Sequence, residues 1–491
     1  MGERSDAMFK TTGSKWLLPV SEFLGFPIDQ VNFIACQLFG LAVAFLFRLY
    51  LKPSHFNPLV RHMVATVLGT AFVVFCFGWY SAHILATVVV NYLIILKADI
   101  NHVHRYSMVT AMGSLTVCHV SRVIIFNYGV PSTDFSGPLM MVTQKITTLA
   151  FQLERPSLLE YLSYNLNFLS ILVGPCSNYN DYKDFIEGSH ISRRLKQHSG
   201  SSNGHNSYDK TPDLSPLNAV CRKLLVCCGC MLLFLIVTRS LPITYNVDPD
   251  FINNADFLTR LTYAFFSIQA ARPKFYFAWT LADAVNNAAG YGFLGIDENG
   301  KPSWDLVSNL NIVGIETATS FKTFIDNWNI RTGVWLKTVC YDRAPKHQLA
   351  LTFILSALWH GVYPGYYFTF LTAIPITMAA RAIRKSVRHH FLNSKSLKLG
   401  YDIVTWAATQ LAICYTVMPF LLLSLDRTLI YYRSMFFHVH ILSILAAFTL
   451  HGKHKPKSAS SVSTKSPPPI SSSSSPDLCQ SVPCNNNDKK A

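Results

Sequence analysis

Apolar residues gather in long runs along this chain, and short polar segments separate the runs. Most runs approach the roughly 20 residues that a helix needs to cross a bilayer. They cover residues 31–51, 63–80, 82–97, 108–126, 158–173, 224–237, 403–425 and 430–450. Further apolar segments, more often interrupted by polar side chains, cover residues 257–271, 276–289 and 349–380. The pattern predicts an all-α, polytopic membrane helical bundle of about 10 spans.

Composition agrees with a membrane location. Of the 491 residues, 50% are hydrophobic and only 14% are charged, whereas soluble domains average about 25% charged residues. The net charge of +15 fits the excess of Lys and Arg at the cytosolic ends of membrane spans. Basic residues cluster at Arg193, Arg194 and Lys196, at Arg381, Arg384, Lys385 and Arg388, and at Lys453, Lys455 and Lys457. We therefore do not expect nucleic acid as a partner.

Three parts are predicted along the chain. Residues 1–30 form a cytosolic or interfacial segment, and residues 31–451 form the membrane domain, whose first run is read as a retained span and not as a cleaved signal. Within that domain, residues 186–221 are rich in Ser, Asn, Gly and Lys and predict a flexible loop. Residues 452–491 contain Pro and Ser runs and too little apolar surface to fold, which predicts a disordered tail.

The most informative residue is His360, which ends an otherwise apolar stretch. Ionisable side chains inside membrane domains are costly and usually functional, and imidazole titrates near neutrality. Basic residues flank the block 349–380 on both sides, which predicts a re-entrant hairpin that bends near Pro364-Gly365 with His360 near its deep end. The structural alternative is a buried histidine that hydrogen-bonds a neighbouring carbonyl.

Other polar residues within apolar segments leave two interpretations open. Asp283, Asn286 and Asn287 form a stripe at helical spacing, and His119 lies one turn from Arg122. Such side chains either line a substrate path or hydrogen-bond between helices. Asn329, taken alone, fits an interfacial loop. No hydrolase, P-loop or zinc-protease motif is present, and no metal is expected.

Two segments together resemble a known family. They read Trp-Asn-Ile-Arg-Thr-Gly-Val-Trp-Leu-Lys at 328–337 and Ser-Ala-Leu-Trp-His-Gly at 356–361. Both resemble the membrane-bound O-acyltransferase (MBOAT) family, and specifically its lysophospholipid acyltransferases. Further similar stretches lie at 135–138, 143–147, 157–162, 277–280 and 283–290, so the resemblance extends from about residue 11 to residue 450.

The resemblance implies the MBOAT fold with a substrate tunnel, in the endoplasmic reticulum membrane. It implies His360 and Asn329 as the catalytic pair and acyl-CoA as co-substrate, with no permanently bound cofactor. The implied acceptors are lysophosphatidylethanolamine, lysophosphatidylserine or lysophosphatidylcholine, and the implied donor carries an unsaturated chain, typically oleoyl. Membrane lipids are the other expected partners, and nothing indicates an oligomeric state. The candidates for lining the tunnel are Trp359, Trp335, Asp283, Asn286, Asn287 and His119.

In the mechanism that follows, His360 is the general base for the acceptor hydroxyl. Asn329 either orients the acceptor or donates to the developing oxyanion, and the sequence favours neither role. Two alternatives to lysophospholipid acylation remain. An MBOAT enzyme that acylates a protein or a sterol fits less well, because the resemblance to lysophospholipid enzymes covers nearly the whole chain. A polytopic lipid or solute transporter fits the hydropathy equally well.

Overall fold

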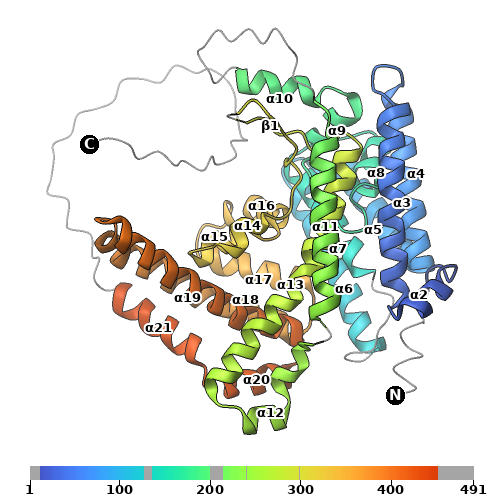
Figure 1. Cartoon of the computed structure of the whole chain (residues 1–491). Coiled ribbons are helices and arrows are strands. Elements are labelled where there is room, and N and C mark those ends of the chain that lie inside the picture. The colour runs from blue at the N-terminus through green and yellow to red at the C-terminus, as the bar shows by residue number, and fades with distance from the viewer. Residues whose placement is uncertain (1–10, 127–134, 200–213, 239, 298, 452–491) are drawn as a thin grey trace, which may run out of the picture. The chain divides into compact units, whose positions relative to one another are not determined.

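The computed structural model describes residues 11–126, 135–199, 214–238, 240–297 and 299–451. Over these residues the chain is almost entirely helical (Figure 1). The strands in the described ranges, β1 (Gly295–Ile296) and β2 (Pro302–Ser303), form one small antiparallel pair. The predicted all-α class is therefore confirmed.

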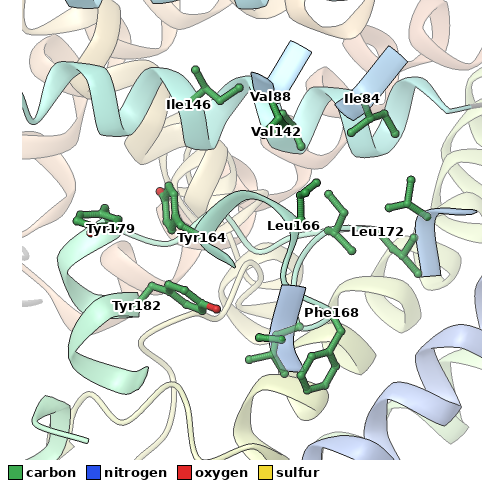
Figure 2. Packing of buried hydrophobic residues seen from close by; sticks show 14 of the residues in the cluster. Ile84, Val88, Val142, Ile146, Tyr164, Leu166, Phe168, Leu172, Tyr179 and Tyr182 are labelled. Carbon is green, nitrogen blue, oxygen red and sulfur yellow. The ribbon is translucent and has the colours of Figure 1, made fainter. Parts of the chain in front are cut away.

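The first half of the chain packs as a group of helices around one apolar core. These helices are α2 (Leu18–Leu24), α3 (Ile28–Tyr50), α4 (Pro58–Phe77), η1 (Gly78–Tyr80), α5 (Ser81–Lys97), α6 (Val103–Phe126), α7 (Ser136–Phe151), α8 (Leu158–Leu166), α9 (Tyr179–Glu187) and α10 (His190–Ser199). Figure 2 shows part of this core, to which Val88 of α5, Val142 of α7 and Tyr164 of α8 belong.

The second half begins with long helices and then includes several short ones. They are α11 (Leu217–Val237), η2 (Ile243–Val247), α12 (Pro249–Asn254), α13 (Phe257–Ala288), α14 (Ile312–Glu316), α15 (Phe321–Asn327), α16 (Ile330–Leu336), η3 (Lys337–Tyr341), α17 (Gln348–His360), α18 (Pro364–Val387), η4 (Arg388–Phe391), α19 (Lys395–Leu422), α20 (Leu425–Ser434) and α21 (His438–His451). The 32-residue α13 joins the halves, because Val285 belongs to the first core and Ile268 to a second one.

Local sequence explains several helix ends. At α8, Ser157 and Glu160 form a capping box, in which each side chain accepts a hydrogen bond from the other residue's backbone N–H. At α4, the side chain of Asn57 accepts from the N–H of Leu59, and Pro58 occupies the first helical position, where no N–H is needed.

Fewer helices than predicted have the length and apolar composition of a membrane span. In the described residues there are four: α3, the helical segment Pro58–Lys97, α11 and α19. The bent pair α20 and α21, with 73° between its helices, would make a fifth. The polytopic architecture is confirmed, and the total of about ten spans stays a prediction. Predicted runs 63–80 and 82–97 lie in one helical segment, and run 158–173 is helical only as far as Leu166.

The predicted flexible loop at 186–221 is partly wrong. The chain forms α10 from His190 to Ser199 and enters α11 at Leu217, while residues 200–213 lie outside the described ranges. The polar composition of α10 is compatible with a helix because its basic side chains find partners on α9. Arg194 donates to Asp181 over 2.7 Å, and Arg193 pairs with Asp184. The predicted disordered tail, 452–491, also lies outside the described residues.

The predicted hairpin at 349–380 is present as a bend between α17 and α18. The helices are interrupted at residues 361–363, just before the predicted Pro364-Gly365. Phe353 of α17 and Phe370 of α18 lie 6.3 Å apart between ring centroids, so the helices fold back on each other. The depth of this hairpin in a membrane stays a prediction.

Candidate active site

His360 is the last residue of α17, and its ring is oriented by the helix that carries it. Nδ1 lies 2.7 Å from the carbonyl oxygen of Ser356, one turn earlier. Because a carbonyl only accepts hydrogen bonds, Nδ1 carries the proton and Nε2 keeps its lone pair. Nε2 has no hydrogen-bond partner among the described residues. The local geometry therefore leaves a basic nitrogen available to a substrate.

Aromatic rings surround this imidazole. The ring centroids of Trp359, Phe370, Phe420 and Tyr366 lie 4.6, 4.9, 5.2 and 5.9 Å from that of His360. His360 is nevertheless half-buried and not fully enclosed. These rings shield much of the base from bulk water.

A glycine makes the sharp turn after His360 possible. Gly361 has φ +139°, a conformation that side chains rarely adopt. A Cβ atom at this position would lie 3.2 Å from the ring of Tyr366 and 3.3 Å from that of His119. His119 also contacts this turn directly, with Nε2 3.3 Å from the carbonyl oxygen of Trp359. His119 thus lies beside the turn that follows His360, where its buried ring contacts the backbone, and its predicted place in a tunnel wall stays a prediction.

Asn329 lies at the start of α16 in a left-handed conformation, with φ 50° and ψ 51°. Asn tolerates this region better than most residues. The preceding loop fixes the conformation: the N–H of Ile330 donates to the carbonyl of Asn309 over 2.9 Å, and the N–H of Arg331 donates to Oδ1 of Asn309 over 2.9 Å. A single buried asparagine thus binds the backbone on the C-terminal side of Asn329.

The same asparagine orients the side chain of Asn329. Nδ2 of Asn309 donates to Oδ1 of Asn329 over 3.0 Å. Oδ1 is therefore occupied as an acceptor, and Nδ2 of Asn329 has no hydrogen-bond partner among the residues described. Asn329 is half-buried, so this amide is accessible as a donor.

Helix α7 holds the segment that follows Asn329. Gln144 donates from Nε2 to Oγ1 of Thr332 over 2.9 Å, and Trp335 donates from Nε1 to Oγ1 of Thr147 over 2.8 Å. All four side chains are buried. Because unpaired polar groups at such depth cost free energy, these bonds favour one position of α16 against α7.

Helix α7 also holds the segment that carries His360. Trp359 donates from Nε1 to the carbonyl of Met140 over 3.2 Å, and its ring lies 5.8 Å from that of Trp335. The two tryptophans predicted to line the tunnel therefore contact each other and are only 2% exposed. Their contacts hold the two segments together, and their predicted place in a tunnel wall stays a prediction.

Helix α7 is itself anchored by an unusual lysine. Lys145 is fully buried, and its ammonium donates to the carbonyls of Tyr164 and Asn165 and to Oγ of Ser170, at 3.1, 3.3 and 2.6 Å. Three oxygens thus satisfy all three N–H groups of the ammonium. The bonds join α7 to the end of α8.

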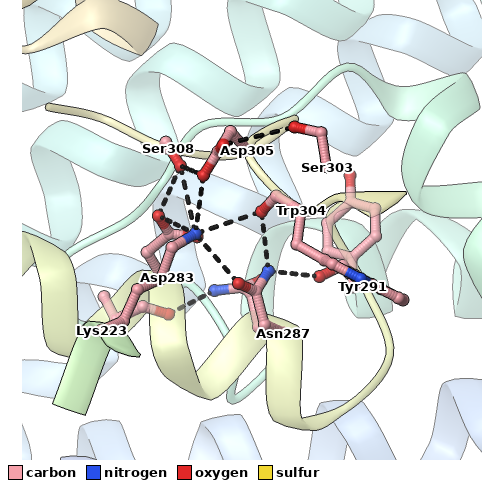
Figure 3. A network of polar contacts seen from close by, with 10 residues as sticks. Lys223, Asp283, Asn287, Tyr291, Ser303, Trp304, Asp305 and Ser308 are labelled. Atoms are coloured by element: carbon pink, nitrogen blue, oxygen red, sulfur yellow. Dashed lines mark hydrogen bonds and ion pairs between the residues drawn. The ribbon is translucent and has the colours of Figure 1, made fainter. Parts of the chain in front are cut away.

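Asp283 belongs to a polar network between α11, α13 and the following loop (Figure 3). Its Oδ2 lies 2.7 Å from Nζ of Lys223 and accepts from Oγ of Ser308 over 2.6 Å. Lys223 also lies 3.2 Å from Asp305. Burial would raise the pKa of Asp305, but the ammonium of Lys223 holds that pKa below its ordinary value. Asp283 is 5% exposed, and the network joins the helices to the loop that leads to Asn309.

Asn286 and Asn287 are also engaged by backbone. Asn287 donates to the carbonyls of Tyr291 and Trp304 over 3.0 and 3.1 Å, and Asn286 donates to that of Leu169 over 3.0 Å. Both side chains are at most 1% exposed. Of the two interpretations that the sequence left open for this stripe, the geometry favours hydrogen bonding between segments over tunnel lining.

No cluster of three or more His, Cys, Asp or Glu side chains suited to a metal ion occurs in the described part of the chain. The site offers the Nε2 atom of His360 as a proton acceptor and the amide of Asn329 as a donor.

Comparison with known proteins assigns this site to a family. The family model for MBOAT, the membrane-bound O-acyltransferase family, matches residues 70–422, which include every site residue described above. The chain belongs to the membrane-bound O-acyltransferase family. The resemblance predicted from residues 328–337 and 356–361 is thereby confirmed, and as an MBOAT protein the chain is an acyltransferase.

Individual MBOAT relatives match over nearly their whole length. Membrane-bound glycerophospholipid O-acyltransferase 1 is 54% identical in Mus musculus, over 91% of this chain and 95% of the relative. The Homo sapiens protein of the same name is 52% identical, over 94% and 98%. Membrane-bound glycerophospholipid O-acyltransferase 2 of Homo sapiens is 50% identical, over 90% and 89%.

Sequence reasoning missed Asn309, the residue that orients the amide of this MBOAT site. It lies in a loop without periodicity, 20 residues before Asn329, and no local signal marks it. Gln144 and Thr147 were noticed only as part of a family-like stretch. Their pairing with α16 depends on contacts 188 residues apart in sequence.

Proposed function

We propose that this chain is an acyl-CoA-dependent lysophospholipid O-acyltransferase of phospholipid remodelling. The acceptor is the free sn-2 hydroxyl of lysophosphatidylethanolamine, lysophosphatidylserine or lysophosphatidylcholine, and the donor is an unsaturated acyl-CoA such as oleoyl-CoA. The names of the relatives support a glycerophospholipid acceptor. The observation that carries the proposal is the free Nε2 of His360 within an aromatic enclosure.

In the proposed reaction His360 is the general base. Nε2 takes the proton of the lysolipid hydroxyl while the oxygen attacks the thioester carbonyl of acyl-CoA. The carbon–sulfur bond then breaks, the new ester forms, and the CoA thiolate receives the proton. Such base catalysis contributes roughly 10²–10⁴-fold to rate. The bond from Nδ1 to Ser356 holds the required tautomer and stabilises the imidazolium that forms.

Asn329 serves in this proposal as a donor. Since its Oδ1 accepts from Asn309, the end left for substrate is the amide N–H. This end can stabilise the oxyanion that develops on the thioester carbonyl, an interaction worth on the order of 10²–10³-fold in rate. The geometry thus supports the oxyanion role over the alternative in which Asn329 accepts a hydrogen bond from the lysolipid.

We place the reaction in the endoplasmic reticulum membrane, in a tunnel that the aromatic side chains around His360 help to line. Both lipid substrates prefer hydrocarbon, whereas CoA is anionic and soluble in water. Entry of CoA from a basic cytosolic face and of the lysolipid from the leaflet would bring them together at His360. Exclusion of water would also limit hydrolysis of the thioester.

The test is acyl transfer in microsomes that contain the full chain, with oleoyl-CoA and a panel of lysophospholipids. We expect the wild type to form product and His360→Ala to lose at least about 10²-fold in turnover. His389→Ala removes an exposed histidine and is the matched control. Equal turnover by wild type and His360→Ala, at equal protein levels, would contradict the role of His360. If the wild type acylates none of the lysophospholipids in the panel, the proposed acceptor class is contradicted.

A further inference from the structure

A cavity lies away from the candidate active site. Its volume is about 230 Å³, and its wall combines the end of α3, the start of α4, the α9–α10 connection and the residues after α13. Arg48, Arg61, His190, Gly290 and Trp304 contribute to the wall. A water molecule takes about 30 Å³ in the liquid, so the cavity has room for a group several times larger.

One wall residue is a buried cation without a counter-ion. Arg61 is only 2% exposed and has no carboxylate partner among the described residues. Its guanidinium lies 5.0 and 5.1 Å from the ring centroids of Phe47 and Phe185 and donates to the carbonyls of Phe185 and Ile186. Unlike the ammonium of Lys145, this guanidinium keeps a buried N–H group, at Nε, without a partner among the described residues, and buried charges are usually paired.

Unpaired polar atoms meet at the same cavity. Nε of Arg61, Nε1 of Trp304 and Nδ1 of His190 are buried and lack a hydrogen-bond partner among the residues described. The first two are donors. Nε2 of His190 lies 3.0 Å from the carbonyl of Gly290, so the proton is on Nε2 and Nδ1 is an acceptor. The wall therefore offers two unpaired N–H groups, two cations and one acceptor for a hydroxyl.

The position in the fold indicates the chemistry of the ligand. Arg48 lies in the last turn of α3, and Arg61 lies in the first turn of α4, which begins the helical segment Pro58–Lys97. Both α3 and that segment have the length and composition of membrane spans. The cavity is therefore at a polar boundary of the membrane domain. Basic pockets between membrane helices at that level bind lipid phosphates.

We infer that this cavity is a phosphate-binding site, in which Arg48, Arg61 and the indole N–H of Trp304 bind a phosphate group that carries or adjoins a hydroxyl. A phospholipid headgroup and coenzyme A both provide such a group. The coenzyme A source rests on the proposed function, whereas the lipid source does not.

The test measures the thermal midpoint of the purified full chain in a maltoside detergent, which contains no phosphate. The probes are phosphatidic acid against diacylglycerol, coenzyme A against pantetheine, and inorganic phosphate alone. We expect a midpoint that rises with concentration for at least one phosphate-bearing probe and not for its phosphate-free counterpart. A rise with phosphatidic acid identifies a lipid site, and a rise with coenzyme A identifies a coenzyme site.

Variants connect that shift to the cavity. Arg48→Gln should raise the Kd of the active probe about tenfold or more, because it removes a charged hydrogen-bond donor. Trp304→Phe should also weaken binding, because it removes the indole N–H that would donate to the phosphate. This N–H has no hydrogen-bond partner among the described residues, so the substitution breaks no described bond within the protein. Arg381→Gln removes an exposed arginine of α18 and should keep the full shift.

The inference is overturned if no probe shifts the midpoint, or if Arg48→Gln and Trp304→Phe keep the full shift. In either case the cavity holds water alone. Acyl transfer assayed in the same preparations separates this outcome from the proposed function. Turnover without a phosphate-dependent shift would reject the cavity site only, and a shift without turnover would reject the transferase only.

Discussion

Asn309 donates a hydrogen bond from Nδ2 to Oδ1 of Asn329 over 3.0 Å, and its own Oδ1 accepts the backbone N–H of Arg331. The side-chain amide of Asn309 therefore determines which way the side-chain amide of Asn329 is turned. In the proposed mechanism Asn309 is a positioning residue, because its hydrogen bond decides which end of the Asn329 amide is left for a substrate.

Replacing Asn309 with aspartate should reverse that direction. The carboxylate still accepts from Arg331, but its second oxygen now requires a donor and should attract the NH2 of Asn329. We expect kcat to fall on the order of 10²-fold with little change in KM, as expected for the loss of an oxyanion donor. Steady-state kinetics with oleoyl-CoA would measure both values.

A control and a double variant make this prediction specific. Asn311→Asp places the same charge two residues away, where the side chain caps the N–H of Gly314 and aspartate caps equally well. It should keep wild-type kinetics. In an Asn329→Ala background, Asn309→Asp should have little further effect, since the two residues act as one unit. Additive losses would contradict the positioning role.

Thr147→Val should destabilise the protein through the partner it leaves behind. The substitution keeps the shape of the side chain but removes the acceptor of the Trp335 indole N–H, in a buried position. An unsatisfied buried donor costs about 1–3 kcal/mol, so the thermal midpoint should fall. Thr116→Val removes a hydroxyl that bonds only within its own helix, to Met112, and should change the midpoint much less. Equal midpoints for the two variants would contradict the proposed anchoring of α16.

The Lys223–Asp283 pair should be far more sensitive to single than to double replacement. Lys223→Met leaves the buried Asp283 without its cation, and breaking such a pair costs about 3–5 kcal/mol. The double variant Lys223→Met/Asp283→Leu removes both charges and should regain part of that stability. Thermal unfolding of wild type, both single variants and the double variant gives the comparison. A double variant as unstable as the sum of the singles would show that the pair is not coupled.

His190 should make stability depend on pH in the acidic range. Burial lowers its pKa from 6.5 to about 4, so between these values the unfolded chain binds a proton that the folded chain does not. The contribution of His190 is therefore complete above about pH 6.5 and is lost as pH falls toward 4, with a slope of at most about 1.4 kcal/mol per pH unit. His190→Gln keeps a donor for Gly290 and should reduce this slope. Thermal midpoints of wild type and variant across the range would show whether the slopes differ.

Features with a local chemical cause were predictable from the sequence. His360 was recognisable because an imidazole in an apolar stretch is costly, and Asn329 was recognisable only from the family resemblance. The positions at which helices end were harder to predict from the sequence, because hydropathy reports composition and not backbone geometry. Run 158–173 is apolar throughout, yet the helix ends at Leu166, and α13 continues through Pro273.

The sequence also could not specify which groups the buried polar side chains bind. Asp283 and Asn287 have the same helical spacing whether they line a tunnel or bind a neighbour. Only the fold brings Lys223 and the carbonyl of Trp304 to them. Asn309 was missed for the same reason, since its function depends on a contact across a loop and not on any pattern around it.

Because α7 provides partners for both Trp335 and Trp359, it forms a common frame for the segments that carry Asn329 and His360. A displacement of α7 would carry the base and the amide together and leave their separation unchanged. Membrane proteins must accommodate bilayers of different thickness by tilting and sliding their outer helices. A frame shared by the two segments would keep the proposed catalytic residues in register while the outer helices adjust to the thickness of the surrounding lipid.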